Sequence, residues 1–454
     1  MLITQYNCFI LAHMLNTKFV EKYTQMLGDQ AESFFASLNG PRHKYIRIAS
    51  SRSADYISEL NNEGVELTKS EELPEVYSVD SGEAKLTGTV GFQTGGFYIM
   101  NPSSVFAAET LCKLMPDYPY ILDVASAPGG KTCAIADLLG NRCAIIANEP
   151  SGKRMKSLQF NIEKYGAFSV RTIGRDGRQL HKTFDRFFDG VLLDAPCSNE
   201  NKIGRNKTVN SEWCQDYVDR MAKLQKEIAE SAFETLKEGG IMVYSTCTFS
   251  VEENEEVVRH LLDNFDCELV DINAGEHTGG VSGDAEVDPF VVRYMPHTDK
   301  YDGFFIAGIR RKGEDSHGGE FSRMKADKSV DMFFDNFPEY AELYEKGGAV
   351  YLTTQMDRSI NFSKNGILIF KRVGELSSQA MWQLSDLMKS KEKTQISLEE
   401  SLRYLKGFDI EKVEDYHGPA LYYYDIPVGM SKPVNNMMKN KLDRYFLYGK
   451  NIEW

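Results

Sequence analysis

Apolar and polar positions follow a strand-then-helix order through the central part of the chain. Residues 121–124 form a short apolar run typical of a buried strand, and residues 132–139 have a helical pattern after a Pro-Gly-Gly turn. Further apolar runs predict buried strands at residues 143–149, 169–175, 190–194 and 241–247. Strands that alternate with helices in this way predict an α/β domain with a doubly wound, Rossmann-like sheet.

One longer helix is predicted between the last two of these strands. Over residues 213–237, apolar side chains recur at helical spacing, which is typical of an amphipathic helix with one face against the core. We expect the buried stripe to comprise Tyr217, Met221, Leu224, Ile228 and Leu236. We assign this stripe to the core and give it no function.

The turn between the first strand and its helix has the composition of a ligand-binding loop. It comprises Ala125, Ser126, Ala127, Pro128, Gly129, Gly130 and Lys131. Backbone without side chains approaches a ligand closely, and amides at a helix start favour a carboxylate or phosphate. The loop matches neither the dinucleotide nor the nucleoside-triphosphate motif, so S-adenosylmethionine is the better candidate. An ordinary structural turn is the alternative.

Three carboxylates end successive predicted strands: Glu149, Asp176 and Asp194. Doubly wound sheets bind ligands beside the carboxyl ends of their strands, where an acidic residue commonly holds ribose hydroxyls. We therefore predict that Glu149 binds a ribose and that Asp176 and Asp194 lie beside the same crevice. A helix cap is the alternative role for any one of them.

Two cysteines follow strand ends and are the candidate nucleophiles. Cys197 closes the segment Asp-Ala-Pro-Cys, and Cys247 closes the last predicted strand, so both should lie at the same sheet edge. Ser250 and Glu253 have capping-box spacing, which predicts a helix start near Ser250 whose dipole would favour a thiolate. The sequence contains no C-x-x-C motif, so it predicts neither a zinc site nor a redox pair.

Taken together, these motifs resemble those of the RNA cytosine-5 methyltransferases. The matching segments are Ala125-Ser-Ala-Pro-Gly-Gly-Lys131, Asn148-Glu149, Asp194-Ala-Pro-Cys-Ser198, and Tyr244-Ser-Thr-Cys-Thr248 followed by Glu252-Glu-Asn-Glu255. Residues 95–104 and 302–305 also resemble the segment before the cofactor domain and the last core strand of that family. Within the family, the chain is most similar to the bacterial enzymes that act on 16S rRNA.

The resemblance implies that the protein transfers a methyl group from S-adenosylmethionine to C5 of cytosine in RNA. It assigns the attack on C6 to Cys247 and assistance with product release to Cys197. Attack at C6 is needed because C5 of cytosine is a poor nucleophile until something adds to C6. Asp194, if protonated, would donate to the base N3 and offset the developing charge. A tRNA cytosine-5 methyltransferase and a non-catalytic RNA-binding assembly factor are the alternatives.

Two positions depart from the family pattern. Ser126 replaces the usual alanine, which is a small change, and Asn199 replaces the usual glycine. Asparagine tolerates a positive φ better than most residues, so we expect the loop after Cys197 to survive this change.

The net charge of −14 argues against a nucleic-acid partner, because such a partner usually requires a basic surface. Basic residues are nevertheless clustered in three places, each of which is either an RNA-binding patch or a solvated face. The clusters are Arg42, Lys44, Arg47 and Arg52; Lys202, Arg205 and Lys207; and Lys432, Lys439, Lys441 and Arg444. The second cluster is the best placed for RNA, since it follows Cys197 directly.

The number and spacing of the cysteines and the length of the apolar stretches indicate the cellular compartment of the protein. Eight cysteines without paired spacing indicate a reducing environment, and we expect a cytoplasmic, monomeric protein. No stretch is long enough to span a membrane. Residues 1–11 are apolar but lack a basic region, which argues against a secretory signal and leaves a start near Met14 as an alternative.

Three domains are predicted along the chain. Residues 16–90 form a small N-terminal α+β domain of RNA-binding type, with a helix over 19–27 and a strand over 44–48, and residues 91–312 form the catalytic domain. By resemblance, residues 320–454 contain a PUA-like RNA-binding module, with short strands predicted at 367–370 and 421–429. A glycine-rich loop is expected over 275–286, and the polar linker over 313–319 predicts a boundary that few contacts cross.

Overall fold

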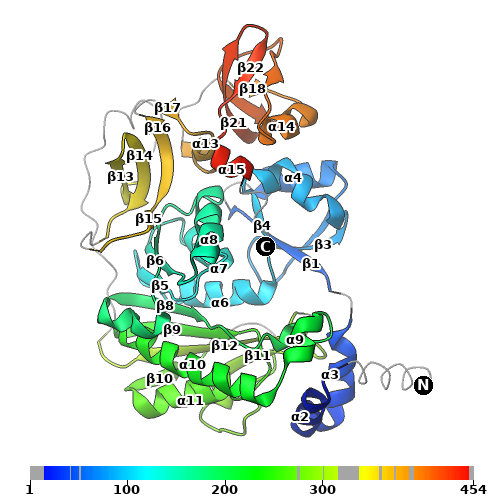
Figure 1. Ribbon diagram of the computed structural model, residues 1–454, viewed down its shortest axis with the longest axis vertical. Helices are drawn as coiled ribbons and strands as arrows, with labels where there is room; N and C mark the ends of the chain where they lie inside the picture. The colour runs from blue at the N-terminus through cyan, green and yellow to red at the C-terminus, as the bar shows by residue number, and fades with distance from the viewer. Residues whose placement is uncertain are drawn as a thin grey trace, which may run out of the picture. The chain divides into compact units, whose positions relative to one another are not determined.

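The computed structural model describes residues 15–40, 42–50, 53–272, 277–299, 301–314, 337–356, 360–372, 375–387 and 393–448. The chain divides into two compact units, each assembled from three segments. Unit 1 comprises Met1–Arg42, Asn101–Ala125 and Arg175–Gly318, and unit 2 comprises His43–Met100, Ser126–Gly174 and Gly319–Trp454. Figure 1 labels many of the helices and strands of both units.

Unit 1 contains a mixed sheet in which three parallel strands adjoin antiparallel ones. β5 (Tyr120–Asp123), β8 (Phe188–Asp194) and β9 (Leu236–Thr246) are parallel neighbours in that order. β12 (Phe304–Arg311) runs antiparallel to β9, and β10 (Cys267–Val270) and β11 (Val291–Tyr294) pair with β12. The parallel strands are largely buried, which explains their continuous apolar runs in the sequence.

The register between β8 and β9 sets the position of the two candidate cysteines. Asp194 of β8 lies opposite Ser245 of β9, so both strands end at the same edge of the sheet. Cys197 and Cys247 follow these two strand ends. Loops at the carboxyl ends of parallel strands are where such sheets usually bind ligands.

Helices α6 (Pro102–Lys113) and α10 (Gln215–Glu234) pack against β8 and β9, and α11 (Glu255–Asn264) packs beside α10 (Figure 1). Unit 1 also contains the short helix α9 (Lys207–Glu212) and the 3-10 turns η4 (Gly177–Lys182), η5 (Glu200–Lys202) and η6 (Asp288–Phe290).

The predicted long helix is present as α10, but the prediction of which residues of this helix face the core is wrong. The buried residues of α10 are Val218, Ala222, Gln225, Ile228, Ala229, Ser231, Ala232 and Phe233. Of the predicted stripe, only Ile228 is buried on the helix, while Tyr217, Met221 and Leu224 are half-buried and Leu236 begins β9. Alanines occupy much of the face that packs against the core. The prediction is based on large apolar side chains, and most of these lie beside that face.

An N-terminal helical hairpin belongs to unit 1. It consists of α2 (Thr17–Leu27), the turn η1 (Gly28–Gln30) and α3 (Ala31–Leu38), and α2 matches the helix predicted over 19–27. Its buried aromatic residues share one apolar cluster with Ile203, Trp213 and Phe249. The hairpin therefore packs on the segments that follow the two cysteines, whereas the predicted strand over 44–48 lies in unit 2.

Unit 2 contains two helices and two parallel strands that follow the predicted cofactor loop. β6 (Ala144–Asn148) and β7 (Val170–Ile173) are parallel, and β15 (Lys364–Asn365) pairs antiparallel with β7. α7 (Gly130–Leu138) packs against β6 and against α8 (Gly152–Lys164).

Three further sheets belong to unit 2. The first has the order β2 (Glu66–Lys69), β3 (Val76–Ser81), β1 (Lys44–Ile48) and β4 (Phe97–Ile99), with α4 (Ser53–Asn62), η3 (Glu83–Gly88) and α5 (Val90–Gln93) between its strands. The second is β13 (Ala341–Lys346), β14 (Ala349–Thr354), β16 (Ile367–Arg372) and β17 (Glu375–Leu376). The third has the order β18 (Lys393–Gln395), β20 (Ala420–Tyr423), β21 (Ile426–Val434), β22 (Met437–Asn440) and β19 (Ile410–Glu411).

Helices α13 (Ser378–Leu384), α14 (Leu398–Leu405) and α15 (Arg444–Tyr448) and the turn η7 (Ser385–Leu387) complete the C-terminal part. The strands predicted over 44–48, 367–370 and 421–429 are confirmed as β1, β16 and the pair β20 and β21. In the described part of the predicted glycine-rich loop, residues 277–286, the one β contact is a bridge from Thr278 to Arg293. The predicted linker lies mostly outside the described residues. The fold is thus mixed α/β with a mixed central sheet and a β-rich C-terminal region.

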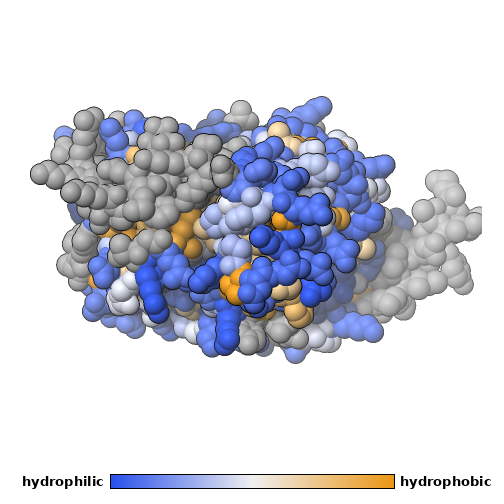
Figure 2. Space-filling model, turned by 90° about the horizontal axis from the view of Figure 1, so that it is seen from above, coloured by the Kyte–Doolittle hydropathy of each residue, from blue (hydrophilic) through white to orange (hydrophobic). Residues whose placement is uncertain are grey.

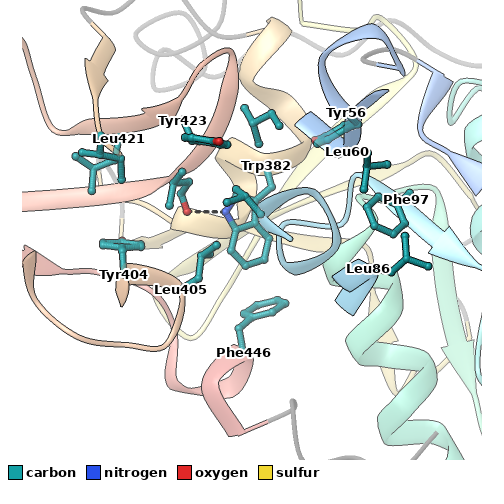
Figure 3. Close-up of a cluster of buried hydrophobic side chains, with 14 of the residues drawn as sticks. Tyr56, Leu60, Leu86, Phe97, Trp382, Tyr404, Leu405, Leu421, Tyr423 and Phe446 are labelled. Atoms are coloured by element: carbon teal, nitrogen blue, oxygen red, sulfur yellow. Dashed lines mark hydrogen bonds between the residues drawn. The ribbon is translucent and has the colours of Figure 1, made fainter. Parts of the chain in front are cut away.

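Residues 46–97 and residues of the C-terminal region share one apolar core in unit 2. Figure 3 shows Tyr56, Leu60 and Phe97 in one cluster with Trp382 and Phe446. The indole Nε1 of Trp382 donates to the carbonyl of Val428 over 2.8 Å. The expectation that few contacts cross from the C-terminal region is therefore wrong, because that region completes a core begun by residues 46–97.

Among the described residues, few large apolar side chains are exposed. Figure 2 shows a face whose described residues are mostly hydrophilic, with hydrophobic ones in small groups. The exposed large hydrophobic residues are Phe290, Phe408, Tyr424, Val434 and Tyr445. Among the described helices, none combines the length and the hydropathy needed to cross a membrane.

Candidate active site

The two predicted cysteines lie side by side in unit 1. Their Sγ atoms are 3.1 Å apart, which confirms that the thiols meet at one sheet edge. Cys197 is 5% exposed, whereas Cys247 is half-buried. The two thiols therefore differ in access to a substrate.

The environment of the pair also makes the two sulfurs chemically unequal. The hydrogen bond with Cys247, burial and the Glu253 carboxylate raise the pKa of Cys197 well above its usual range. Cys197 thus stays a thiol at neutral pH and is able to donate its hydrogen. This leaves Cys247 as the candidate nucleophile, since a thiolate is the form that attacks carbon.

The predicted helix start near Ser250 is wrong. Residues 251–254 form a turn, and α11 begins at Glu255 with Asn254 as its N-cap. The side chains of Ser250 and Glu253 do meet at 3.1 Å, but the Glu253 carboxylate also accepts from the Ser198 amide. The macrodipole acts within the first turn of a helix, so α11 starts too late to act on Cys247.

Glu253 is a fully buried carboxylate beneath the loop of Cys197. It accepts from the backbone N–H of Ser198 at 2.9 Å and from the hydroxyl of Ser198 at 2.5 Å. Burial and the neighbouring Glu200 raise the pKa of Glu253 to about 7. This carboxyl therefore changes charge near neutral pH.

Glu200 is a second buried carboxylate, and it joins the two cysteine loops to the N-terminal hairpin. It accepts from Thr248 Oγ1 at 2.6 Å and from the Phe249 amide at 2.9 Å, both in the loop after Cys247. It also accepts from the hydroxyl of Tyr23 at 2.5 Å and from the indole of Trp213 at 2.7 Å. Burial and Glu200 raise the pKa of Tyr23 well above its usual range, so its hydroxyl remains a donor.

Asn199, which replaces the glycine usual in the resembled family, has a left-handed backbone conformation. Its φ is +57°, and its side-chain amide donates to the carbonyl of Cys197 at 2.8 Å. Its Oδ1 accepts a contact from Cys247 Sγ at 3.4 Å. The positive φ of Asn199 agrees with the expectation that asparagine tolerates this conformation.

The turn after Cys247 is held by polar side chains on both sides. Thr246 Oγ1 donates to Asn254 Oδ1 at 2.5 Å, and the Asn254 amide donates to the carbonyl of Thr248 at 3.1 Å. Arg293 forms a buried ion pair with Glu255 and donates to the carbonyl of Phe249 at 2.8 Å.

The strand-end carboxylates Asp194 and Asp176 have different surroundings in unit 1. Asp194 accepts from the hydroxyl of Ser245 at 3.0 Å, one strand away. Asp176 caps η4 by accepting from the Arg178 amide, and its ion pair with the Arg178 guanidinium at 2.6 Å lowers its pKa. The capping alternative is thus realised at Asp176, and its cofactor role stays a prediction.

Side chains of helix α8 hold the predicted cofactor loop in unit 2 by donating to carbonyl groups of the loop. Arg154 donates to the carbonyl of Ala127 at 2.6 Å, and Asn161 donates to the carbonyl of Pro128 at 2.8 Å. Gly129 has a φ of +107° and is the N-cap of α7, and a Cβ there would lie 3.0 Å from Leu158. The predicted strand, turn and helix are therefore present, with the helix beginning at Gly130.

Glu149 follows β6 in the same unit and is 1% exposed. Its Oε1 accepts from the Ser151 amide at 2.8 Å. Its Oε2 lies 3.2 Å from Arg154 Nη1, yet it has no hydrogen-bond partner among the described residues. A buried carboxylate oxygen without a donor is the acceptor that a ligand hydroxyl would satisfy.

Most of the residues in the three predicted basic clusters form ion pairs with acidic residues. Arg42 and Arg205 both approach Asp302, at 3.0 and 3.3 Å. The other ion pairs are Lys44 with Glu83, Arg47 with Asp137, Lys439 with Asp409 and Lys441 with Glu375. Lys202, Lys207, Lys432 and Arg444 are exposed, and Arg52 lies outside the described residues.

Comparison with known proteins places the chain in a family. Residues 113–310 match the family described as 16S rRNA methyltransferase RsmB/F. The Ribosomal RNA small subunit methyltransferase F of Vibrio atlanticus is 30% identical, with 92% of this chain and 94% of that protein aligned. Its counterpart from Pectobacterium atrosepticum is also 30% identical over 81% of each chain. The chain belongs to the RsmB/F family of 16S rRNA methyltransferases.

A solved structure agrees with this membership. A methyltransferase homologue from Pyrococcus horikoshii is 30% identical, covers 65% of this chain and 95% of its own, and superposes with a TM-score of 0.57. As an RsmB/F family member, the protein is an S-adenosylmethionine-dependent RNA cytosine-5 methyltransferase.

The residues present fit this cofactor of the RsmB/F family. The buried Oε2 of Glu149 offers an acceptor for a ribose hydroxyl, and Gly129, the N-cap of α7, has no side chain to cap the first amides of that helix. When bound, S-adenosylmethionine supplies the methyl group.

Several buried polar residues of the site were not predicted from the sequence. They are Tyr23, Ser198, Glu200, Gln225 and Thr248. Glu200 and Gln225 are polar residues in otherwise unremarkable surface-like sequence, and nothing in their local pattern indicates burial. Glu200 does follow Asp-Ala-Pro-Cys-Ser-Asn directly, and that position beside the Cys197 motif is the one signal that could have indicated it.

Proposed function

We propose that this protein methylates C5 of a cytosine in 16S rRNA, in the cytoplasm. The observation that carries the proposal is the thiol pair, in which Cys197 is buried and protonated and Cys247 is half-buried 3.1 Å away. The names of the relatives favour small-subunit ribosomal RNA over tRNA. The target base must be unstacked to expose both ring faces, so a single-stranded or distorted rRNA segment is the expected substrate.

In this reaction Cys247 attacks C6 of the cytosine as a thiolate. The new S–C6 bond replaces the C5–C6 double bond and makes C5 nucleophilic, so that C5 takes the methyl group. Water then takes the C5 proton, the C5–H electron pair re-forms the C5–C6 double bond, and the S–C6 bond breaks to release Cys247 as a thiolate. Cys197 assists this departure by donating a hydrogen bond to the leaving sulfur.

The remaining site residues have supporting roles in the proposal. Asp194, which Ser245 holds at 3.0 Å, donates to the base N3 when protonated. Residues 125–131, Glu149, Asp176 and Asp194 hold S-adenosylmethionine on a doubly wound, Rossmann-like domain spanning residues 91–312. Residues 16–90 and the PUA-like C-terminal region, residues 320–454, contact RNA.

Bisulfite mapping of total RNA from a deletion strain tests this function. Wild-type protein should restore one or more 5-methylcytosines in 16S rRNA, and the Cys247→Ala variant should not. A restored mark in tRNA instead would favour the tRNA alternative. Equal maps with and without the gene would contradict the proposal.

A further inference from the structure

One buried carboxylate touches the loops of both cysteines. Glu253 Oε1 lies 2.5 Å from the hydroxyl of Ser198, which follows Cys197, and 3.3 Å from the hydroxyl of Thr248, which follows Cys247. These two hydroxyls are themselves 2.8 Å apart. The three groups therefore form a bridge between the residue that follows Cys197 and the residue that follows Cys247.

A glutamine of α10 extends this bridge to the other side of Cys197. The Nε2 of Gln225 donates to Glu253 Oε2 and to the carbonyl of Pro196, both at 2.8 Å. Glu253 Oε2 also accepts from the Ser198 amide at 2.9 Å. The backbone is thus held immediately before and immediately after Cys197, and every one of these side chains is buried.

One arrangement of hydrogens satisfies every contact of the bridge. In it Glu253 is protonated and donates to Ser198, Ser198 donates to Thr248, and Thr248 donates to Glu200 at 2.6 Å. When Glu253 is ionised, Ser198 donates to Glu253 instead, and the 2.8 Å contact between Ser198 and Thr248 is left without a hydrogen. The protonated form of Glu253 is therefore the form that binds the two hydroxyls together.

We propose that Glu253 is a positioning residue that holds Cys197 and Cys247 in register for methyl transfer. It does so by binding Ser198 and Thr248 together and by orienting Gln225 on Pro196. The inference rests on the proposed function of the two thiols. Glu253 is fully buried and its hydrogen bonds go to the loops and to Gln225, so it acts on the reaction by positioning these loops, in addition to its charge beside Cys197.

Kinetics of the full-length enzyme separate positioning from RNA binding. Glu253→Ala should lower kcat by at least about tenfold, because small misplacements of reacting groups are costly, while the KM for RNA stays within about threefold. Glu253→Gln should recover most of kcat, since its amide reproduces the protonated arrangement with the carbonyl toward Ser198 N–H. Glu252→Gln is the matched control, because Glu252 pairs with Lys22 and Gln215 and makes no contact with Ser198 or Thr248. An unchanged kcat in Glu253→Ala, or a loss in Glu253→Gln as large as in Glu253→Ala, overturns the proposal.

Thiol alkylation gives a second readout that needs no RNA. Under brief iodoacetamide treatment, peptide mass spectrometry should show Cys197 protected in wild type and at least about tenfold more reactive in Glu253→Ala. Cys267, buried in β10 of the same unit, should stay protected. Exposure of Cys197 and Cys267 together would indicate general unfolding and contradict a positioning role. If Glu253→Ala is not recovered folded, Gln225→Leu should give the same selective exposure of Cys197.

The two readouts also separate this inference from the proposed function. A wild-type protein that methylates no cytosine, with Cys197 still selectively exposed in Glu253→Ala, would contradict the proposed reaction and leave the bridge in place. Active wild type with Cys197 equally protected in both proteins would contradict the bridge alone.

Discussion

The hydroxyl of Tyr23 donates to the buried Glu200 carboxylate over 2.5 Å, which ties the N-terminal helix α2 to the loop after Cys197. The same carboxylate holds Thr248 and the Phe249 amide in the loop after Cys247. The N-terminal hairpin is therefore part of the support for the two thiols, in addition to any contact it makes with RNA.

Tyr23→Phe should destabilise unit 1 by about 1 to 3 kcal/mol, because it removes a donor from a buried carboxylate while keeping the ring packed. Urea denaturation followed by tryptophan fluorescence, to which Trp213 beside the same carboxylate contributes, measures the change. Tyr424→Phe, at a side chain that is 61% exposed, should be neutral within about 0.5 kcal/mol. Equal changes in the free energy of unfolding for the two substitutions would contradict a stabilising role of the Tyr23 hydroxyl.

Glu253 should make stability depend on pH near neutrality. Folding raises its pKa from 4.5 to about 7, so the protonated form is favoured in the folded state. The associated stability, on the order of 3 kcal/mol, is fully present below about pH 4.5 and is lost as pH rises through about 7. Free energies of unfolding from about pH 5 to about pH 8 should fall for wild type and for Glu252→Gln. In Glu253→Gln this contribution should vanish, and an unchanged slope would contradict the assignment.

Glu149→Ala should weaken S-adenosylmethionine binding by about ten- to a hundredfold, the cost of losing hydrogen bonds to a charged acceptor. Titration calorimetry with the cofactor measures the loss, and circular dichroism checks that the fold is kept. Glu163→Ala is a matched control, because Glu163 is a buried carboxylate of the same unit that pairs with Lys364 at 2.5 Å. Unchanged affinity in Glu149→Ala would remove the ribose-binding role.

Deleting residues 319–454 should leave unit 2 unable to fold, because it removes Trp382, Phe446 and their neighbours from a core shared with residues 46–97. The milder Trp382→Ala should cost about 3 to 5 kcal/mol. Dye binding to exposed apolar surface and limited proteolysis report both changes. A truncated protein that is monomeric, protease-resistant and binds no dye would contradict the shared core.

The elements that the sequence predicted best are those with strong local patterns. The apolar runs that became β5, β6, β7, β8 and β9, and the glycine turn before α7, are determined by burial and by backbone conformation within a few residues. The thiol pair was also predictable, because parallel strands place their carboxyl ends at one edge.

The features that sequence reasoning missed depend on contacts far apart in the chain. The spacing of Glu253 from Ser250 predicts a helix cap. In the structure the carboxylate of Glu253 instead accepts hydrogen bonds from Ser198 and Gln225. The buried face of α10 was misplaced because alanines and Gln225 lie against the core. Neither outcome is encoded in the local pattern of apolar positions.

The central claim is that Cys247 attacks the base and Cys197 assists its release, and trapping of the RNA adduct tests it most directly. Purified Cys197→Ala and Cys247→Ala variants, incubated with unmodified 16S rRNA and S-adenosylmethionine, are resolved on a denaturing gel. Cys197→Ala should accumulate a covalent RNA adduct, because attack proceeds and release stalls, and Cys247→Ala should form none. An adduct in Cys247→Ala alone would make Cys197 the nucleophile, and full activity in both variants without any adduct would contradict thiol catalysis.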